Sequence, residues 1–141
     1  LVLYAFAGRL ITQRPVGDMQ EEQQEKVPLA YPVPILLYEV QQLMNEGGLI
    51  IDARIPELFE AGHIEGAISL PLVDIETVLP DFSRRVEKDS TVVTYFSGFG
   101  CPYSFDIGVW LIETCYSDVL VFEGGYPEWR DAGLAIAGEG Q

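Results

Sequence analysis

Short apolar runs alternate along the chain with segments whose apolar residues recur at helical spacing. The apolar runs predict strands at residues 33–36, 49–53, 67–70, 91–96 and 119–122. None of them alternates cleanly between apolar and polar residues, so each is expected to be buried on both faces. Strands that alternate with helices predict an α/β domain with a mostly parallel sheet, helices on both faces and right-handed crossovers.

The segments between these runs predict short helices with recognisable ends. Helices are expected over about residues 40–47, 56–61, 73–79, 104–114 and 127–132. Pro56 suits a first helical turn, and Ser104 is a plausible N-cap for the fourth helix. Cys115 stands after that helix, where glycine is expected as a left-handed cap. Residues 80–90 are expected to form a charged connection.

The N-terminal part of the chain differs from the rest. Residues 12–34 are polar and interrupted by prolines, as in a linker, and residues 1–11 are apolar, LVLYAFAGRLI. We therefore divide the chain into an N-terminal segment with its linker, residues 1–31, and one domain, residues 32–141. The apolar segment has two interpretations: the remnant of a membrane anchor, or an ordered segment that packs on the domain or on a neighbouring copy. The compartment, cytoplasmic or extracytoplasmic at a membrane, stays open.

Charge and composition narrow the classes of function. Eight basic and 22 acidic residues give a net charge of -14, which argues against nucleic-acid or anionic-membrane binding. One histidine and two cysteines are too few for a disulfide framework or a structural zinc site. No metal or cofactor is predicted.

The most informative stretch is TVVTYFSGFGCPYS, residues 91–104. It predicts a strand, a loop and a helix start, and in parallel α/β sheets ligands and nucleophiles sit at that kind of junction. The candidate active-site loop contains Ser97, Gly98, Phe99, Gly100, Cys101, Pro102, Tyr103 and Ser104. The two glycines are expected to adopt positive φ or to form an anion-binding nest.

Two flanking segments indicate a family. The run IDARIPELFEAGHIEGAISLP, residues 51–71, and the run VLVFEGGYPEWRDAGLAI, residues 119–136, resemble motifs of the rhodanese-like domain family, and the resemblance covers roughly residues 33–137. It implies a three-layer domain with a five-stranded parallel sheet. It also implies sulfurtransferase activity, in which a cysteine persulfide carries sulfane sulfur from a small donor to a thiol acceptor.

The same resemblance draws attention to Phe96. A typical member of the family places its nucleophile directly after the tyrosine that ends this strand, and here that position is Phe96. Phenylalanine can neither ionise nor carry sulfur. The loop also resembles a subgroup with a Cys-x-x-x-x-Cys loop, in which Cys101 and Ser104 match the second half and Phe96 replaces the first cysteine.

Cys101 is the remaining candidate for sulfur chemistry. Its position near a helix start is compatible with a stabilised thiolate. Alternatively it is a structural or leftover resolving cysteine, because residues 97–104 contain no Lys, Arg or His. The same absence disfavours thiosulfate or phosphate as a substrate. A phosphatase mechanism is the least favoured, since the loop lacks both a nucleophile at the strand end and an arginine for the phosphoryl oxygens.

Three further polar residues are candidates for supporting roles. Asp52 and Arg54 end the second strand, where they either line the pocket or stabilise the fold, Arg54 by pairing with a carboxylate or capping carbonyls. His63 lacks a nucleophile partner in the sequence and is interpreted as a hydrogen-bonded fold determinant. Trp110 and Trp129 are expected in the core.

Three hypotheses follow for function. The domain is a sulfurtransferase or thiol-redox protein that uses Cys101, or it is a non-catalytic module that binds a protein partner or small ligand. The third hypothesis is that Phe96 replaces a natural cysteine of an active enzyme. An oligomer formed through the apolar N-terminal segment is compatible with each of them.

Overall fold

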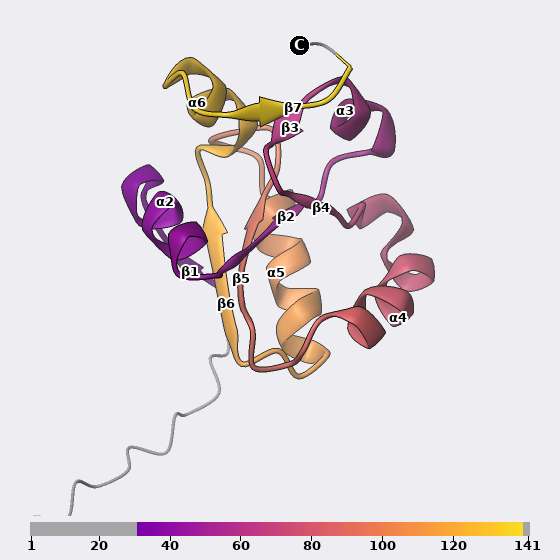
Figure 1. Ribbon diagram of the computed structural model, residues 1–141. Helices are drawn as coiled ribbons and strands as arrows, with labels where there is room; N and C mark the ends of the chain where they lie inside the picture. Colours follow the sequence, from indigo (N-terminus) through magenta and orange to yellow (C-terminus); the bar gives the residue numbers. More distant parts are fainter. Residues whose placement is uncertain (1–30, 140–141) are drawn as a thin grey trace, which may run out of the picture.

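A five-stranded parallel sheet forms the centre of the domain in the computed structural model, which describes residues 31–139. Its strands, in spatial order, are β1 (Val33–Pro34), β6 (Asp118–Phe122), β5 (Thr91–Tyr95), β2 (Leu49–Asp52) and β4 (Ile68–Ser69). All neighbouring pairs are parallel. The predicted parallel sheet is confirmed, and β5, which leads into the candidate loop, is its middle strand (Figure 1).

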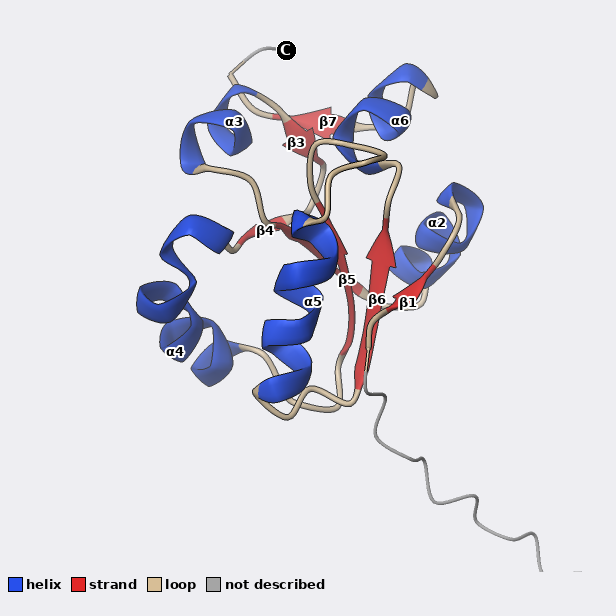
Figure 2. Ribbon diagram, turned by 180° about the vertical axis from the view of Figure 1, so that it is seen from behind, coloured by secondary structure: helices blue, strands red, loops and turns tan. Residues whose placement is uncertain are grey.

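Helices cover both faces of the sheet, as predicted. One face packs against α2 (Leu37–Asn45) and α6 (Gly125–Asp131), and the other against α4 (Ile75–Arg85) and α5 (Tyr103–Glu113). Figure 2 shows α4 and α5 together on their face, with α2 on the opposite side of the sheet. A short helix, α3 (Pro56–Ala61), lies beyond the carboxyl ends of the strands. A 3-10 turn, η1 (Leu72–Asp74), leads into α4.

The burial of consecutive strand residues explains the missing alternation in the sequence. Ile51 and Val92 pack in the cluster with α4 and α5, whereas Ile50 and Val93 pack in the cluster with α2 and α6. All four are at most 2% exposed. Successive side chains of a strand point to opposite faces, so a sheet covered on both sides favours apolar residues at consecutive positions.

The helices contribute one apolar stripe each to these clusters. Ile107 and Leu111 of α5 are fully buried, and the predicted burial of Trp129 in α6 is confirmed. Trp110, also expected in the core, is only partly buried at the margin of the α5 cluster. Its ring is therefore available to line a surface cavity.

The charged connection predicted at residues 80–90 is wrong over its first half. Helix α4 continues through Pro80 to Arg85. Proline lacks the N–H that would bond to the carbonyl four residues earlier, which normally ends a helix. Here Leu79 and Phe82, on either side of Pro80, are buried in the core, and this burial offsets the lost hydrogen bond.

The start of α5 also differs from the prediction. The N-cap position is Pro102, the helix begins at Tyr103, and Ser104 is a buried residue inside its first turn. The backbone carbonyl of Ser104 accepts a hydrogen bond from Thr94 Oγ1 at 2.7 Å. This bond ties the start of α5 to the middle strand of the sheet.

Two short strands were not predicted. β3 (His63–Ile64) and β7 (Ile136–Ala137) form an antiparallel pair apart from the main sheet. Each has two residues, and the pairing joins parts of the chain about seventy positions apart, so local periodicity carries no signal for it. The pair lies beside α3 and α6, above the carboxyl ends of the strands (Figure 1).

Cys115 adopts the left-handed conformation predicted for it, with φ of 73°. We expect Cys115→Gly to raise the free energy of unfolding by about 0.5–1 kcal/mol, because glycine reaches this conformation without the strain of a Cβ. Urea denaturation measures the change. Cys115→Ala is the matched control, since it removes the sulfur and keeps the Cβ. A gain of equal size in both variants would contradict the backbone explanation.

Among residues 31–139 no helix has the length and apolarity needed to cross a membrane. The apolar segment at residues 1–11 lies outside the described residues, so the two interpretations of that segment and the division of the chain at residue 31 stay predictions.

Candidate functional site

The carboxyl ends of β2 and β5 place two apolar side chains next to each other. Asp52 and Tyr95 are partners in the parallel register, and the N–H of Ala53 donates to the carbonyl of Tyr95 at 3.1 Å. The residues that follow, Ala53 and Phe96, therefore leave the sheet side by side. Both belong to the α4–α5 face, which is the face where the candidate loop turns into α5.

Ala53 and Phe96 line an apolar pocket of about 290 Å³ at this edge. The lining residues are Ala53, Ile55, Leu72, Val73, Phe96 and Tyr103. The rings of Phe96 and Tyr103 pack edge to face, with their centroids 5.1 Å apart. None of the six residues carries a charge or a thiol, so the pocket favours apolar groups over small anions.

The loop after Phe96 is held by the turn that starts α6. The N–H of Tyr126 donates to the carbonyl of Phe96 at 3.1 Å. Gly125 has φ of 62°, and a Cβ there would lie 2.5 Å from the Phe96 oxygen and 2.7 Å from the Gly98 nitrogen. The positive φ predicted for Gly98 and Gly100 is confirmed, at 123° and 81°. Close backbone contact therefore requires glycine at position 125, and the positive φ favours glycine at positions 98 and 100.

Cys101 lies in the loop but outside the wall of the apolar pocket. Its N–H donates to the carbonyl of Gly98 at 3.3 Å, and its side chain is partly exposed. Cys115 is exposed beyond the other end of α5, and both thiols are free. The 11 residues of α5 separate them by about 16 Å, so they cannot form a disulfide within one chain.

Asp52 and Arg54 form a buried ion pair on the other face of the sheet. Arg54 Nη2 lies 2.7 Å from Asp52 Oδ2, and Arg54 Nε lies 3.1 Å from Oδ1. The hydroxyl of Tyr95 donates to Asp52 Oδ2 at 2.5 Å and accepts from the N–H of Ile64 at 3.1 Å. Arg54 Nη2 also donates to the carbonyl of Gly62 at 2.6 Å. These bonds join β2, β5 and β3.

Burial and charge shift the pKa of two side chains in this cluster, Tyr95 and Arg54. Burial raises the pKa of the Tyr95 hydroxyl well above its ordinary value, and the negative charge of Asp52 adds to the rise. Burial opposes the charge of Arg54, but its hydrogen bonds and charge pairing with Asp52 outweigh this and raise the pKa of the guanidinium. The guanidinium also lies 4.4 Å from the centre of the Tyr126 ring. Arg54 is thus fully engaged and unavailable to an anion in the pocket.

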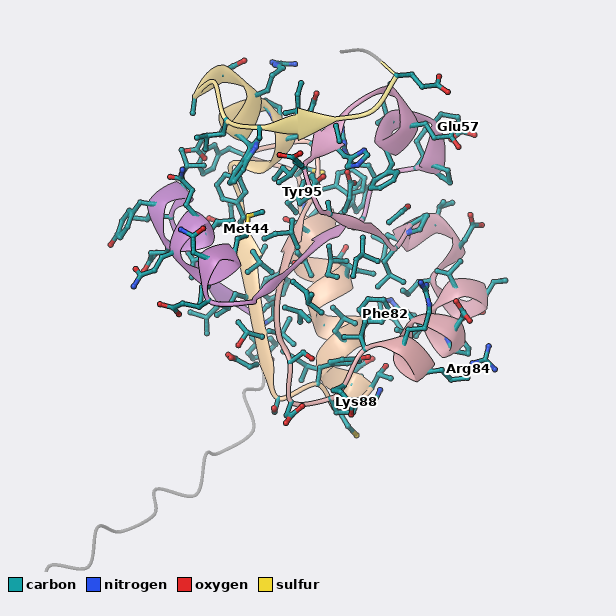
Figure 3. All side chains as sticks on the ribbon, viewed as in Figure 1. Met44, Glu57, Phe82, Arg84, Lys88 and Tyr95 are labelled. Atoms are coloured by element: carbon teal, nitrogen blue, oxygen red, sulfur yellow. The ribbon has the colours of Figure 1, made fainter. Side chains whose placement is uncertain are left out.

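The structure places the predicted site residues in two groups. Phe96 and Tyr103 meet in the apolar pocket, while Asp52 and Arg54 lie on the opposite face of the sheet, beneath the β3–β7 pair. Tyr95, whose hydroxyl donates to Asp52, is labelled in Figure 3 below the β3–β7 pair. His63 is separate from both groups: its ring stacks on Phe59 at 3.7 Å, and its Nδ1 lies 2.7 Å from the Phe59 carbonyl.

Sequence reasoning missed most of the pocket wall. Ile55, between β2 and α3, is 43% exposed, and Val73, in η1, is 72% exposed. The sequence did offer one signal for these wall residues: both are large apolar residues in the segments that follow parallel strands, where ligand sites form. Over residues 31–139 no group of three His, Cys, Asp or Glu side chains is placed to hold a metal ion.

Comparison with known proteins agrees with the fold and the sequence motifs. Residues 36–132 match the rhodanese-like domain family. Over 87 residues the chain is 36% identical to the thiosulfate sulfurtransferase GlpE of Pseudomonas putida, covering 61% of this chain and 73% of that protein.

Two further proteins are similar to this chain, one in sequence and one in structure. An HTH-type transcriptional regulator of Mycobacterium tuberculosis is 32% identical over 87 residues, or 62% of this chain and 36% of the regulator. The structure of protein BH2092 of Bacillus halodurans superposes with a TM-score of 0.66 at 22% identity, covering 79% of each chain. The chain belongs to the rhodanese-like domain family and is related to thiosulfate sulfurtransferases.

Proposed function

We propose that this chain is a rhodanese-like binding module that no longer transfers sulfur at its strand-end position. The observation that supports this most strongly is the place of Phe96. It follows the last residue of β5, where the family resemblance puts the nucleophile, and its ring forms a wall of the apolar pocket. A persulfide requires a thiolate at that point. An aromatic ring at that point instead offers an apolar surface to a bound ligand or partner.

The surface around the pocket favours a protein or apolar ligand. Three of the large apolar side chains that line the pocket are also exposed at the surface: Ile55, Val73 and Tyr103. Clustered exposed apolar residues around a cavity are typical of interaction sites. The pocket therefore offers a partner a place to bury an aliphatic or aromatic group.

A second candidate function is sulfur handling by Cys101. Its side chain is partly exposed, and the N–H groups of Ser97, Phe99 and Gly100 donate no hydrogen bond to another residue within 31–139. Free amides of this kind can face an anion. In that reaction the Cys101 thiolate would attack the outer sulfur of thiosulfate, form a persulfide and release sulfite. Against it, residues 97–104 supply no cation to hold the donor.

Mass spectrometry of the intact protein after incubation with thiosulfate separates the two functions. We expect no gain of one sulfur atom by the natural chain, because Phe96 cannot carry it. An adduct that persists in Cys115→Ser and disappears in Cys101→Ser would overturn the proposal in favour of the second function. The Pseudomonas putida sulfurtransferase serves as the positive control for the donor.

Phe96→Cys tests whether the loop keeps the rest of a sulfur-transfer site. We expect this variant also to stay unloaded by thiosulfate, because neither the loop nor the pocket wall presents a cation and Arg54 is bound elsewhere. Loading of Phe96→Cys would instead indicate that the third hypothesis is correct and that one substitution separates this chain from an active enzyme.

A further inference from the structure

A second, acidic cavity adjoins the apolar pocket at Val73. This cavity has a volume of about 270 Å³ and is lined by Val73, Asp74, Ile75, Glu76, Thr77 and Trp110. Val73 belongs to both walls. On the α5 side Tyr103 lines the first cavity and Trp110 the second, about 10 Å further along the helix. We call the two cavities together the docking groove.

Charge is distributed unevenly along the docking groove. Its pocket end is uncharged, whereas Asp74 and Glu76 line the other end. Asp106 is exposed and lies, by helical spacing, on the same side of α5 as Tyr103 and Trp110. The groove therefore suits a segment that presents a large apolar side chain next to a positive charge.

The basic residues of the described part of the chain are all placed elsewhere. Arg54 is buried with Asp52, Arg84 and Arg85 pair with Asp81, Arg130 pairs with Asp131, and Lys88 contacts Ser83 and Tyr116. No lysine or arginine among residues 31–139 lines the groove. A cation that binds at the acidic end of the groove must therefore come from outside residues 31–139.

The chain itself contains a segment of matching chemistry. Residues 1–17 include Arg9 and Arg14 and no Asp or Glu, although the whole protein has a net charge of -14. Between the two arginines lie Leu10 and Ile11, in the sequence GRLITQRP of residues 8–15. This segment combines large apolar side chains with positive charge, as the groove requires.

The point at which the chain enters the domain makes the groove reachable. The ring of Tyr31 stacks on Phe105 of α5 at 6.1 Å, and Pro32 packs against Gly108 of the same helix. α5 is also one wall of the groove. The 19 residues from 12 to 30 can span about 60 Å when extended, far more than the roughly 10 Å diameter of a helix.

We propose that residues 8–15 bind in the docking groove of their own chain, with Leu10 or Ile11 in the apolar pocket and an arginine at Asp74 and Glu76. This rests on the proposed function, since it assigns an occupant to the same pocket. Tethering supplies an effective concentration of the order of 1 mM, so a weak contact is sufficient. An external partner must displace the segment, which makes the segment an intramolecular regulator of binding.

Paramagnetic relaxation in the full chain tests this placement. A spin label is attached at Thr12→Cys in a Cys101→Ser, Cys115→Ser background. We expect the amide signals of Val73, Tyr103 and Trp110 to broaden, and the broadening to weaken as salt screens the charges. A label at Glu46→Cys, at the end of α2 on the opposite face of the sheet, is the matched control.

Mixing experiments identify the occupant. The spin-labelled protein is diluted with protein that carries no spin label. Intramolecular docking predicts that the signals of the spin-labelled molecules stay broadened after dilution. Broadening seen only between separate molecules would overturn the intramolecular proposal and indicate a second copy in the groove. Absence of broadening at the three residues would overturn it as well.

Nile red, a neutral apolar dye, separates failure of this inference from failure of the proposed function. We expect Arg9→Glu with Arg14→Glu to bind the dye about three- to tenfold more tightly than the natural chain, because the competing segment is released. Equal binding by both proteins would contradict docking while leaving the pocket as a binding site. If neither protein binds the dye, or if Val73→Asp leaves the binding unchanged, the pocket proposal itself fails.

Discussion

Arg54→Met is expected to lower the free energy of unfolding by about 3–5 kcal/mol, because it leaves the carboxylate of Asp52 buried without its counter-charge. Arg54 and Asp52 are 4% and 0% exposed, so water cannot replace the lost partner. The carbonyl of Gly62 also loses its donor, which loosens the contact between β2 and the end of α3. Urea denaturation followed by circular dichroism measures the loss.

Arg130→Met is the matched control for this substitution. Arg130 is half-exposed and pairs only with its neighbour Asp131 among carboxylates of the described chain. Exposed ion pairs of this kind contribute about 0–1 kcal/mol. Similar losses in both variants would show that the Asp52–Arg54 pair does not hold the fold. The sulfur-loading assay should give the same result for the natural chain and for Arg54→Met, since Arg54 does not line the pocket.

Tyr95→Phe should cost about 1.5–3 kcal/mol at neutral pH, because a hydrogen bond to a charged group is lost and the N–H of Ile64 loses its acceptor. Tyr95 is fully buried, and the aromatic ring is retained in the variant, so packing is nearly unchanged. The same denaturation experiment measures the loss. A change below 0.5 kcal/mol would contradict the assigned hydrogen bonds, since surface substitutions are commonly of about that size.

The Tyr95 hydroxyl also predicts a loss of stability in alkaline solution. Its pKa in the folded protein is raised above the ordinary value of 10.0, so the folded state holds the proton more tightly than the unfolded state. The stabilisation is therefore complete below about pH 10 and declines as the pH rises further, by up to about 1.4 kcal/mol per pH unit. Tyr95→Phe should remove this part of the decline.

Tyr116→Phe controls for the other perturbed phenol. Burial raises the pKa of Tyr116 as well, and its hydroxyl donates to the carbonyl of Val86 at 2.8 Å. Within residues 31–139 Glu87 acts on Tyr116 through its charge, but no carboxylate accepts a hydrogen bond from the Tyr116 hydroxyl, so its variant should keep most of the alkaline decline. An identical pH profile for the natural chain and Tyr95→Phe would contradict the raised pKa of Tyr95.

Local patterns were sufficient for most of the architecture. The strands that form the centre of the sheet were recognisable because Ile50, Ile51, Val92 and Val93 are apolar at consecutive positions, which a sheet covered on both faces requires. Patterns failed where distant contacts outweighed local preference. Pro80 stays helical because its neighbours are buried, and β3 exists only because β7 lies beside it.

The sequence by itself determined the parallel α/β architecture, the loop after β5 and the aromatic residue at its first position, because these depend on the order of residues along the chain. Only the tertiary structure decided which side chains share that site. Asp52 and Tyr95 point to one face of the sheet, and Ala53 and Phe96, one residue later on each strand, point to the other. That alternation separates the buried ion pair from the pocket. Apart from Ile55, which follows β2, the remaining walls of the pocket come from η1 and α5, which only folding brings to the ends of β2 and β5.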